Sequence, residues 1–349
     1  MMRKTTKQVK VGSLTVGGSA DISVQSMLNR PAHDFEANII QAKELETADC
    51  EIIRVSIPTE KSLALIPKLK EAVSVPIVAD IHFHYKLALE SVAAGADKIR
   101  INPGNIGDES KVKEVVDACR HKRVPIRIGV NSGSVEKELL AKYGGPKPAA
   151  MVESTLKHVK LLEKFDFEDI VLSIKSSHVP TMVECYEMVS QACNYPLHLG
   201  VTEAGTYQTS LIKSSAGLGA LLLRGIGDTI RVSMADEPVR EVEVAYEILK
   251  ALGLRQAGPT LIVCPTCGRT GIDLIGLAKR VEDMLKGCKK NITVAVMGCE
   301  VNGPGEAAHA DIGIAAGKGR VLIFREGKAL RTVSEALALQ ALKEEIDKI

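Results

Sequence analysis

Residues 77–102 have the sequence IVADIHFHYKLALESVAAGADKIRIN, and this stretch decides the fold. Short β-branched runs at 77–81 and 98–102 predict two strands. Between them, residues 85–93 place apolar side chains three and four positions apart, the spacing of an amphipathic helix. The stretch is therefore predicted to form a strand–helix–strand unit, from which parallel sheets are built.

The same alternation continues through the first two thirds of the chain. Eight predicted strands in about 250 residues match the size and rhythm of a (β/α)8 barrel. We predict an α/β fold with a TIM-type barrel over residues 1–255 that binds the substrate; an open doubly wound sheet is the alternative. The predicted strands are residues 22–26, 51–57, 77–81, 98–102, 126–130, 169–175, 197–202 and 229–233, and the predicted helices include 61–72, 85–93, 109–121, 151–164, 179–191 and 237–252.

A linker is predicted where Gly253, Gly258 and Pro259 break the last helical pattern. A chain of 349 residues also exceeds the size at which one core usually stops growing. We therefore predict a second, small α+β domain over residues 260–349. Its predicted strands are residues 261–263, 291–297, 311–315 and 320–325, and its predicted helices are 273–286 and 334–348.

The composition excludes several classes of protein. Hydrophobic residues make up 45% of the chain, which is typical of a folded globular protein. The net charge is only +2, and there are no Trp, five Phe and six Tyr, so a stacking platform for nucleic acid is poorly supplied. No apolar run approaches the ~20 residues that span a bilayer. A cytoplasmic protein without nucleic-acid or membrane partners is predicted.

The carboxyl ends of the predicted barrel strands carry several cations. Barrel enzymes place their chemistry on this face. Because like charges repel, basic residues on different strands predict an anion with several negative charges, such as a diphosphate. The alternative is that each one pairs with a helix carboxylate or caps a strand end. The cations are Arg54, Arg100, Arg127, Lys175 and Arg231, and the other polar residues at these ends are Asp80, His82, Asn102, Asn131, His198, Glu203 and Ser233.

Two Gly-rich stretches and one carboxylate add to this predicted site. Residues 129–134 (GVNSGS) and 214–219 (SSAGLG) are predicted loops whose backbone amides could bind phosphate. Neither is a Walker loop, and the alternative for each is that its glycines only make a turn. Glu203 follows a strand end and is a candidate proton donor, with an ion pair to a neighbouring Arg as the alternative.

Two cysteine motifs lie in the second domain. Residues 264–269 are CPTCGR and residues 298–306 are GCEVNGPGE. Their spacing leaves two metal centres open: zinc, with Cys288 or His309 as a fourth ligand, or a 4Fe-4S cluster with three thiolates and an oxygen ligand. The basic barrel mouth favours the cluster, because it suggests reductive chemistry on a diphosphate. Glu306 is then the candidate fourth ligand, while Cys50, Cys119, Cys185, Cys193 and Cys288 are explained as small apolar residues.

Four motifs together resemble the bacterial short form of the 4-hydroxy-3-methylbut-2-enyl diphosphate synthase family. They are residues 100–105 (RINPGN), 127–134 (RIGVNSGS), 264–269 and 297–306, and the resemblance extends over nearly the whole chain. Val263 and Glu300 depart from the family pattern, which has Ser and a small apolar residue there. The resemblance implies one 4Fe-4S cluster per chain, held by Cys264, Cys267, Cys299 and, in the resting enzyme, Glu306.

The resemblance also implies a reaction: the reductive ring opening and dehydroxylation of 2-C-methyl-D-erythritol 2,4-cyclodiphosphate in non-mevalonate isoprenoid biosynthesis. Ferredoxin or flavodoxin would supply the electrons, and Glu203 would give a proton to the departing hydroxyl. A homodimer with an active site shared between subunits is implied. The implied substrate-binding residues are Arg54, Arg100, Arg127, Asn131, Lys175, Arg231 and Ser233, with Asn302 from the opposite subunit.

Two other functions remain open from the residues alone. One is a non-redox barrel lyase or aldolase acting on a sugar phosphate, with Lys175 as a Schiff-base residue and a structural zinc in the second domain. The other is a zinc-bearing module that captures a polyanion without chemistry. The identity of the metal separates both from the reductase.

Overall fold

The computed structural model describes residues 3–299, 307, 309–317 and 319–349. The chain divides into two compact units, Met1–Arg255 and Gln256–Ile349. Each unit has its own buried apolar core.

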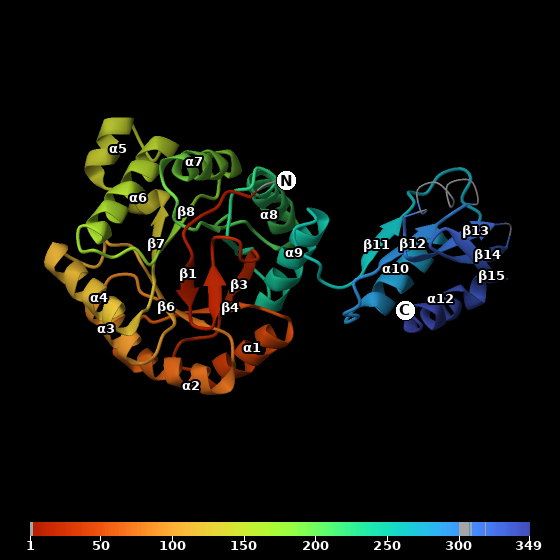
Figure 1. Ribbon diagram of the computed structural model, residues 1–349, viewed down its shortest axis with the longest axis horizontal. Coiled ribbons are helices and arrows are strands. Elements are labelled where there is room, and N and C mark those ends of the chain that lie inside the picture. Colours follow the sequence, from red (N-terminus) through yellow and green to blue (C-terminus); the bar gives the residue numbers. More distant parts are fainter. Residues whose placement is uncertain (1–2, 300–306, 308, 318) are drawn as a thin grey trace. The chain divides into compact units, whose positions relative to one another are not determined.

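The first unit is a barrel of eight parallel strands surrounded by helices (Figure 1). The strand order is β8-β7-β6-β5-β4-β3-β10-β9, and a parallel bridge between Leu172 and Leu197 joins its two ends. The predicted TIM-type barrel is therefore confirmed, and the open doubly wound sheet is wrong. The strands are β3 (Ser23–Met27), β4 (Ile52–Ser56), β5 (Ile77–Asp80), β6 (Lys98–Ile101), β7 (Ile126–Asn131), β8 (Ile170–Lys175), β9 (His198–Leu199) and β10 (Thr229–Ile230).

The helices of the first unit cover the outside of the barrel. Every residue of β5, β6 and β8 is buried, because helices cover the outer face and side chains fill the interior. The helical elements are α1 (Phe35–Thr47), η1 (Glu60–Ala64), α2 (Leu65–Ala72), α3 (Tyr85–Ala93), α4 (Glu109–Lys122), η2 (Ser132–Ser134), α5 (Lys137–Tyr143), α6 (Pro148–Glu163), α7 (Val179–Ala192), α8 (Tyr207–Leu222) and α9 (Pro238–Ala251).

Helix α8 corrects one prediction. Residues 214–219 were expected to form a phosphate-binding loop, but they lie inside α8, where their amides make helical hydrogen bonds. Gly217 serves packing instead, because a Cβ atom there would lie 2.6 Å from the Met182 side chain of α7. Glycine at this position lets the two helices approach closely.

A short hairpin that was not predicted covers the amino-terminal ends of two barrel strands. Strands β1 (Val9–Val11) and β2 (Leu14–Val16) pair antiparallel. Gly12 makes the turn with a φ of 57°, in the left-handed region that suits glycine. Val11 and Val16 pack against Ile52 and Val78 in a small separate cluster, so the hairpin closes this end of the barrel.

The second unit is a mixed sheet with helices, as the predicted α+β module requires. Its strand order is β11-β12-β13-β14-β15; the first three strands are parallel and the last two pairings are antiparallel. Strand β15 was not predicted, because nearly all its side chains are exposed and it lacks an apolar pattern. The elements are β11 (Thr260–Val263), α10 (Leu274–Leu285), β12 (Thr293–Met297), β13 (Ile312–Gly317), β14 (Arg320–Arg325), β15 (Lys328–Ser334), η3 (Glu335–Leu337) and α12 (Ala338–Asp347).

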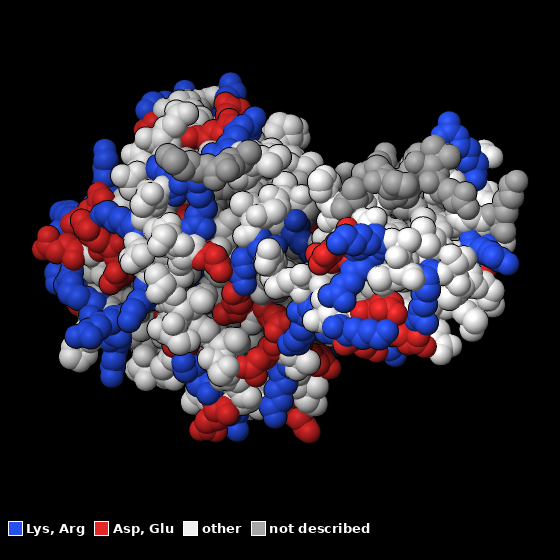
Figure 2. All heavy atoms as spheres, turned by 45° about the vertical axis from the view of Figure 1, so that its right-hand side comes forward, with Lys and Arg blue, Asp and Glu red and all other residues white. Residues whose placement is uncertain are grey.

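Two surface properties accord with the composition. Among the described helices, none has the length and apolar character needed to cross a bilayer. On the face in Figure 2, basic and acidic side chains are interspersed on both units. Cytoplasmic localisation stays a prediction.

Candidate active site

The barrel interior brings together the five predicted cations. Arg54 lies on β4, Arg100 on β6, Arg127 on β7 and Lys175 at the end of β8, and they are 7%, 6%, 0% and 7% exposed. Arg231 directly follows β10, with its side chain 15% exposed. Burial lowers the pKa of Lys175 well below its ordinary value, and the positive charges of the four arginines lower it further. Five strands thus bring their cations close together inside the barrel. Arg127, however, is the second residue of β7 and does not lie at its carboxyl end, where it was predicted.

Asp80, at the end of β5, binds three basic side chains. One of its carboxylate oxygens accepts a hydrogen bond from Arg54 Nη2 at 2.6 Å and lies 3.0 Å from His82 Nε2. The other accepts one from Arg100 Nη1 at 3.3 Å. Burial alone would raise the pKa of Asp80, but Arg54, His82 and Arg100 hold it well below its ordinary value. Asp80 therefore stays ionised and fixes two of the arginines.

Glu241, on α9, fixes a third arginine. Arg231 donates from Nε and Nη2 to the two carboxylate oxygens of Glu241, at 3.1 and 3.0 Å. Glu241 is only 3% exposed and also accepts a hydrogen bond from Ser26 at 2.7 Å. The alternative interpretation, pairing with a helix carboxylate, is therefore right for Arg231. Glu241 itself was not predicted as a site residue, because it lies on helix α9 and not at a strand end.

Arg127 and Lys175 differ from these three residues. In the described part of the chain, neither forms an ion pair, and Arg127 makes one long hydrogen bond, 3.4 Å from Nη1 to Gln25 Oε1 across the barrel. Burial, followed by Arg54 and Arg100, lowers the pKa of Arg127, but a guanidinium stays protonated in proteins. Burying an unpaired charge is costly. This uncompensated positive charge favours an anionic ligand at the mouth.

A cavity of about 370 Å³ opens at the same end of the barrel. Asn131, at the end of β7, has a side-chain oxygen with no hydrogen-bond partner among the described residues. Glu203 is exposed, and its φ of 51° is unusual for a residue other than glycine. Strained backbone of this kind is concentrated at functional sites. The cavity is lined by Asn131, Ser132, Gly133, Ser134, Ser177, Thr202 and Glu203.

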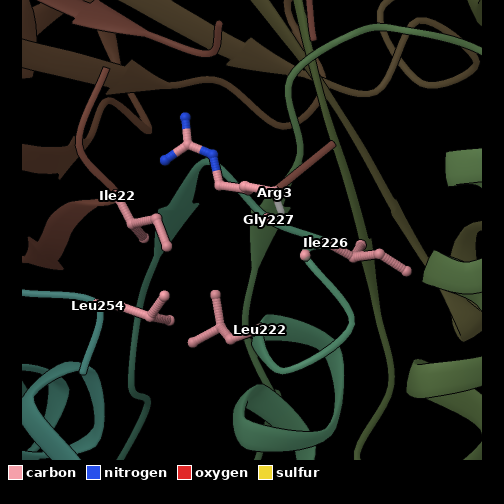
Figure 3. A pocket seen from close by; sticks show the side chains of 7 residues that line it. Arg3, Ile22, Leu222, Ile226, Gly227 and Leu254 are labelled. Carbon is pink, nitrogen blue, oxygen red and sulfur yellow. The ribbon is translucent and has the colours of Figure 1, made fainter. Parts of the chain in front are cut away.

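A second, much smaller cavity lies at the opposite end of the barrel (Figure 3). Its volume is about 10 Å³, and apolar side chains such as Ile22, Leu222 and Leu254 form most of its wall. At this size it holds one water molecule at most. It is not a ligand site.

In the second unit, the two cysteine motifs meet at one edge of the sheet. Cys264 directly follows β11, and Cys299 comes two residues after β12. These strands are parallel neighbours with Val263 opposite Val296. The loops also touch, since the amide of Gly271 donates to the carbonyl oxygen of Gly298 at 3.3 Å. The strand pairing therefore places both motifs on the same side of the unit.

Three free thiols in these loops are candidate ligands for a metal centre. Cys264 and Cys299 are 6% and 8% exposed, Cys267 is exposed, and all three thiols are free. A Cβ atom on Gly298 would lie 2.8 Å from Leu274, so glycine is needed where the two loops meet. Within the described residues, no three His, Cys, Asp or Glu side chains form a ready metal site. The predicted residues Asn302 and Glu306 lie outside the described part.

The other cysteines do not join this centre. Cys288 precedes β12, so the strand separates it from Cys299 by roughly 17 Å at the usual rise per residue. His309 is exposed. Cys50, Cys119 and Cys185 are buried in the barrel unit, and burial raises the pKa of Cys50 to about 12. These three behave as apolar residues; Cys193 is half-buried.

Comparison with known proteins identifies the family. The GcpE TIM-barrel domain matches residues 6–246, and the GcpE protein C-terminal domain matches residues 260–348. The chain belongs to the GcpE family. Its GcpE relatives include proteins named 4-hydroxy-3-methylbut-2-en-1-yl diphosphate synthase (flavodoxin). That of Clostridium perfringens is 56% identical over 100% of this chain and 99% of its own length, and that of Caldanaerobacter subterraneus is 54% identical over 100% and 98%.

Solved structures show a more distant likeness of the GcpE barrel. Dihydropteroate synthase from Stenotrophomonas maltophilia is similar with a TM-score of 0.53 and 14% identity, over 71% of this chain and 98% of that one. The Yersinia pestis enzyme has a TM-score of 0.51 and 14% identity, over 71% and 100%. At this identity the likeness supports the barrel fold alone.

Proposed function

We propose that the protein catalyses the reductive ring opening of 2-C-methyl-D-erythritol 2,4-cyclodiphosphate to (E)-4-hydroxy-3-methylbut-2-enyl diphosphate in non-mevalonate isoprenoid biosynthesis. The names of relatives with 52–56% identity over nearly the whole chain support this function. The observation that carries it is the excess of positive charge buried in the barrel, where Lys175 pairs in the sheet with Asn131 of the cavity wall. A diphosphate neutralises that charge.

The cations have two roles in binding this substrate. Asp80 and Glu241 hold Arg54, Arg100 and Arg231 in place before the substrate arrives. This preorganisation lowers the entropy lost on binding. Arg127 and Lys175 supply the charge that no carboxylate offsets, and both donate charge-assisted hydrogen bonds to phosphate oxygens. Asn131 and Ser233 add neutral hydrogen bonds.

Glu203 is the proposed proton donor. Glu203 lines the cavity and is exposed to solvent. In the reaction, the ring C–O bond to phosphate breaks and a hydroxyl leaves as water. The proton from Glu203 goes to that hydroxyl oxygen. The electrons come from flavodoxin, the donor in the relatives' names, or from ferredoxin.

We further propose that the second unit holds a 4Fe-4S cluster. Cys264, Cys267 and Cys299 would hold it with Glu306 as the fourth ligand, and it would supply electrons one at a time at low potential. We also propose a homodimer with a shared active site, to which Asn302 of the opposite subunit contributes. The thiol-rich loops at one sheet edge support the cluster.

One observation favours a second candidate, the lyase or aldolase. Burial and the neighbouring arginines lower the pKa of Lys175, as a Schiff-base lysine requires. Borohydride reduction in the presence of a sugar phosphate such as dihydroxyacetone phosphate would then attach the ligand to Lys175. The reductase predicts no such adduct.

Metal analysis separates these candidates. After anaerobic purification we expect about four iron and four sulfide per chain, with a brown chromophore that dithionite bleaches. Stoichiometric zinc without a chromophore would instead support the lyase or the binding module.

A further inference from the structure

A further lysine lies inside the barrel, below the mouth. Lys98, the first residue of β6, is fully buried, and its Nζ has no hydrogen-bond partner among the described residues. In the strand register, Val78 lies opposite both Lys98 and Arg54. Paired positions on neighbouring strands point to the same face of a sheet. Lys98 and Arg54 therefore both point into the barrel.

Cations and neutral groups surround Lys98. The positive charges of Arg127 on β7 and Arg54 on β4 lower the pKa of Lys98. His198 of β9 is fully buried, shares a 3.4 Å contact with Thr229 of β10 through Nδ1, and has no partner for Nε2 in the described part of the chain. Gln25 of β3 is neutral. Lys175 and Arg231 lie on the remaining strands, β8 and the end of β10.

The carboxylates of the barrel interior are already engaged. Asp80 of β5 binds Arg54, Arg100 and His82, and Glu241 of α9 binds Arg231. Burial lowers the pKa of Lys98 well below its ordinary value, and Arg127 and Arg54 lower it further. The pKa of His198 is lowered in the same way, first by burial and then by Arg127 and Lys175. Lys98 and Lys175 are therefore two buried primary amines without an ion-pair partner in the described part of the chain, and the charge of each depends on what the mouth contains.

We propose that Lys98 is a positioning residue of the anion site, which takes up a proton from solvent when an anion binds at the mouth and releases it when the anion leaves. The identity of the anion as a cyclic diphosphate rests on the proposed function; the uptake itself does not. Negative charge close to an amine favours its protonated form. Ring opening frees a phosphate oxygen and adds negative charge, so protonated Lys98 also favours the product.

Linkage gives this coupling a definite sign. If anion binding is accompanied by proton uptake, affinity falls as the pH rises, because the proton concentration in solution is then lower. For each pH unit by which the bound anion raises the pKa of Lys98, the protein with Lys98 protonated binds the anion about tenfold more tightly than the protein with neutral Lys98. Affinity should be highest at low pH, where Lys98 is already protonated.

Isothermal titration calorimetry in buffers of different ionisation enthalpy measures the uptake directly. We use 2-C-methyl-D-erythritol 2,4-cyclodiphosphate and, separately, inorganic sulfate, because neither anion titrates near neutral pH. The wild-type protein should take up protons with both anions. Lys98→Met should take up fewer protons than the wild type, since only Lys175 is then left to respond, and should show a weaker pH dependence and about tenfold weaker binding at neutral pH.

Two variants separate this role from a structural one. In the ligand-free protein, Lys98 is a buried amine without a hydrogen-bond partner in the described structure, and burying such a group is costly. Lys98→Met should therefore fold with an unchanged or raised Tm. Lys98→Arg keeps a permanent charge and should restore affinity with no more proton uptake than Lys98→Met shows. Lys160→Met, an exposed lysine on α6, is the matched control and should behave as wild type.

The outcomes distinguish the two proposals. If sulfate drives proton uptake but the cyclodiphosphate does not bind, the proposed substrate is wrong and the role of Lys98 stands. The role of Lys98 is overturned if the wild type binds either anion without proton uptake, if it binds neither, or if Lys98→Met takes up as many protons as the wild type.

Discussion

Cys299→Ser is expected to abolish iron binding and to reduce reductive turnover to background, while the barrel stays folded. A serine hydroxyl does not replace a thiolate as a soft ligand for iron. The barrel should survive because the two units have separate apolar cores. Iron and sulfide analysis of the anaerobically purified variant measures the loss of iron binding, and far-ultraviolet circular dichroism shows whether the barrel stays folded.

Cys288→Ser is the matched control for this variant. Cys288 belongs to the same unit and is also a free thiol, but it precedes β12 whereas Cys299 follows it. It should retain the full iron content and activity of the wild type. A Cys299→Ser protein with full iron occupancy would refute the ligand assignment.

Arg127→Met is expected to weaken substrate binding strongly without destabilising the protein. Truncating a buried, hydrogen-bonded charge contact costs about 2–4 kcal/mol, which corresponds to roughly a 30- to 700-fold loss of affinity. In the ligand-free protein the same change removes a buried cation that has no carboxylate partner in the described structure. Stability should therefore be unchanged or higher. Calorimetric titration and urea unfolding measure the two effects.

Asp80→Asn is the contrasting variant, because it removes the carboxylate that Arg54 and Arg100 share. Leaving buried charges unpaired should lower the free energy of unfolding by about 3 kcal/mol. The two variants thus separate binding from stability. If Arg127→Met destabilises the ligand-free protein as much as Asp80→Asn does, Arg127 is a structural residue.

The fold was largely predictable because buried parallel strands have a strong local pattern. Strands such as Ile77–Asp80 and Ile170–Lys175 are apolar runs bounded by helices, and the structure places them within a residue or two of their predicted limits. The failures have physical causes. In α8, small residues that serve helix packing resemble a loop, and β15 is an exposed edge strand without an apolar pattern.

The site was predictable only where one rule applied. Arg54, Arg100 and Lys175 were found because barrel enzymes use the carboxyl ends of their strands. Glu241 lies on a helix and Lys98 at the start of a strand, so the same rule misses both. The roles of Asn302 and Glu306 stay predictions, since both lie outside the described residues.

The most direct test of the proposed reaction is turnover of 2-C-methyl-D-erythritol 2,4-cyclodiphosphate under anaerobic conditions, followed by phosphorus NMR. Reduced flavodoxin is the donor, and dithionite with methyl viologen replaces it in a parallel reaction so that donor choice cannot decide the result. We expect the two ring phosphorus signals to be replaced by those of a linear diphosphate monoester, and only when a reductant is present. Unchanged ring signals with both reductants, in a protein that carries its full iron and sulfide, would contradict the proposed function.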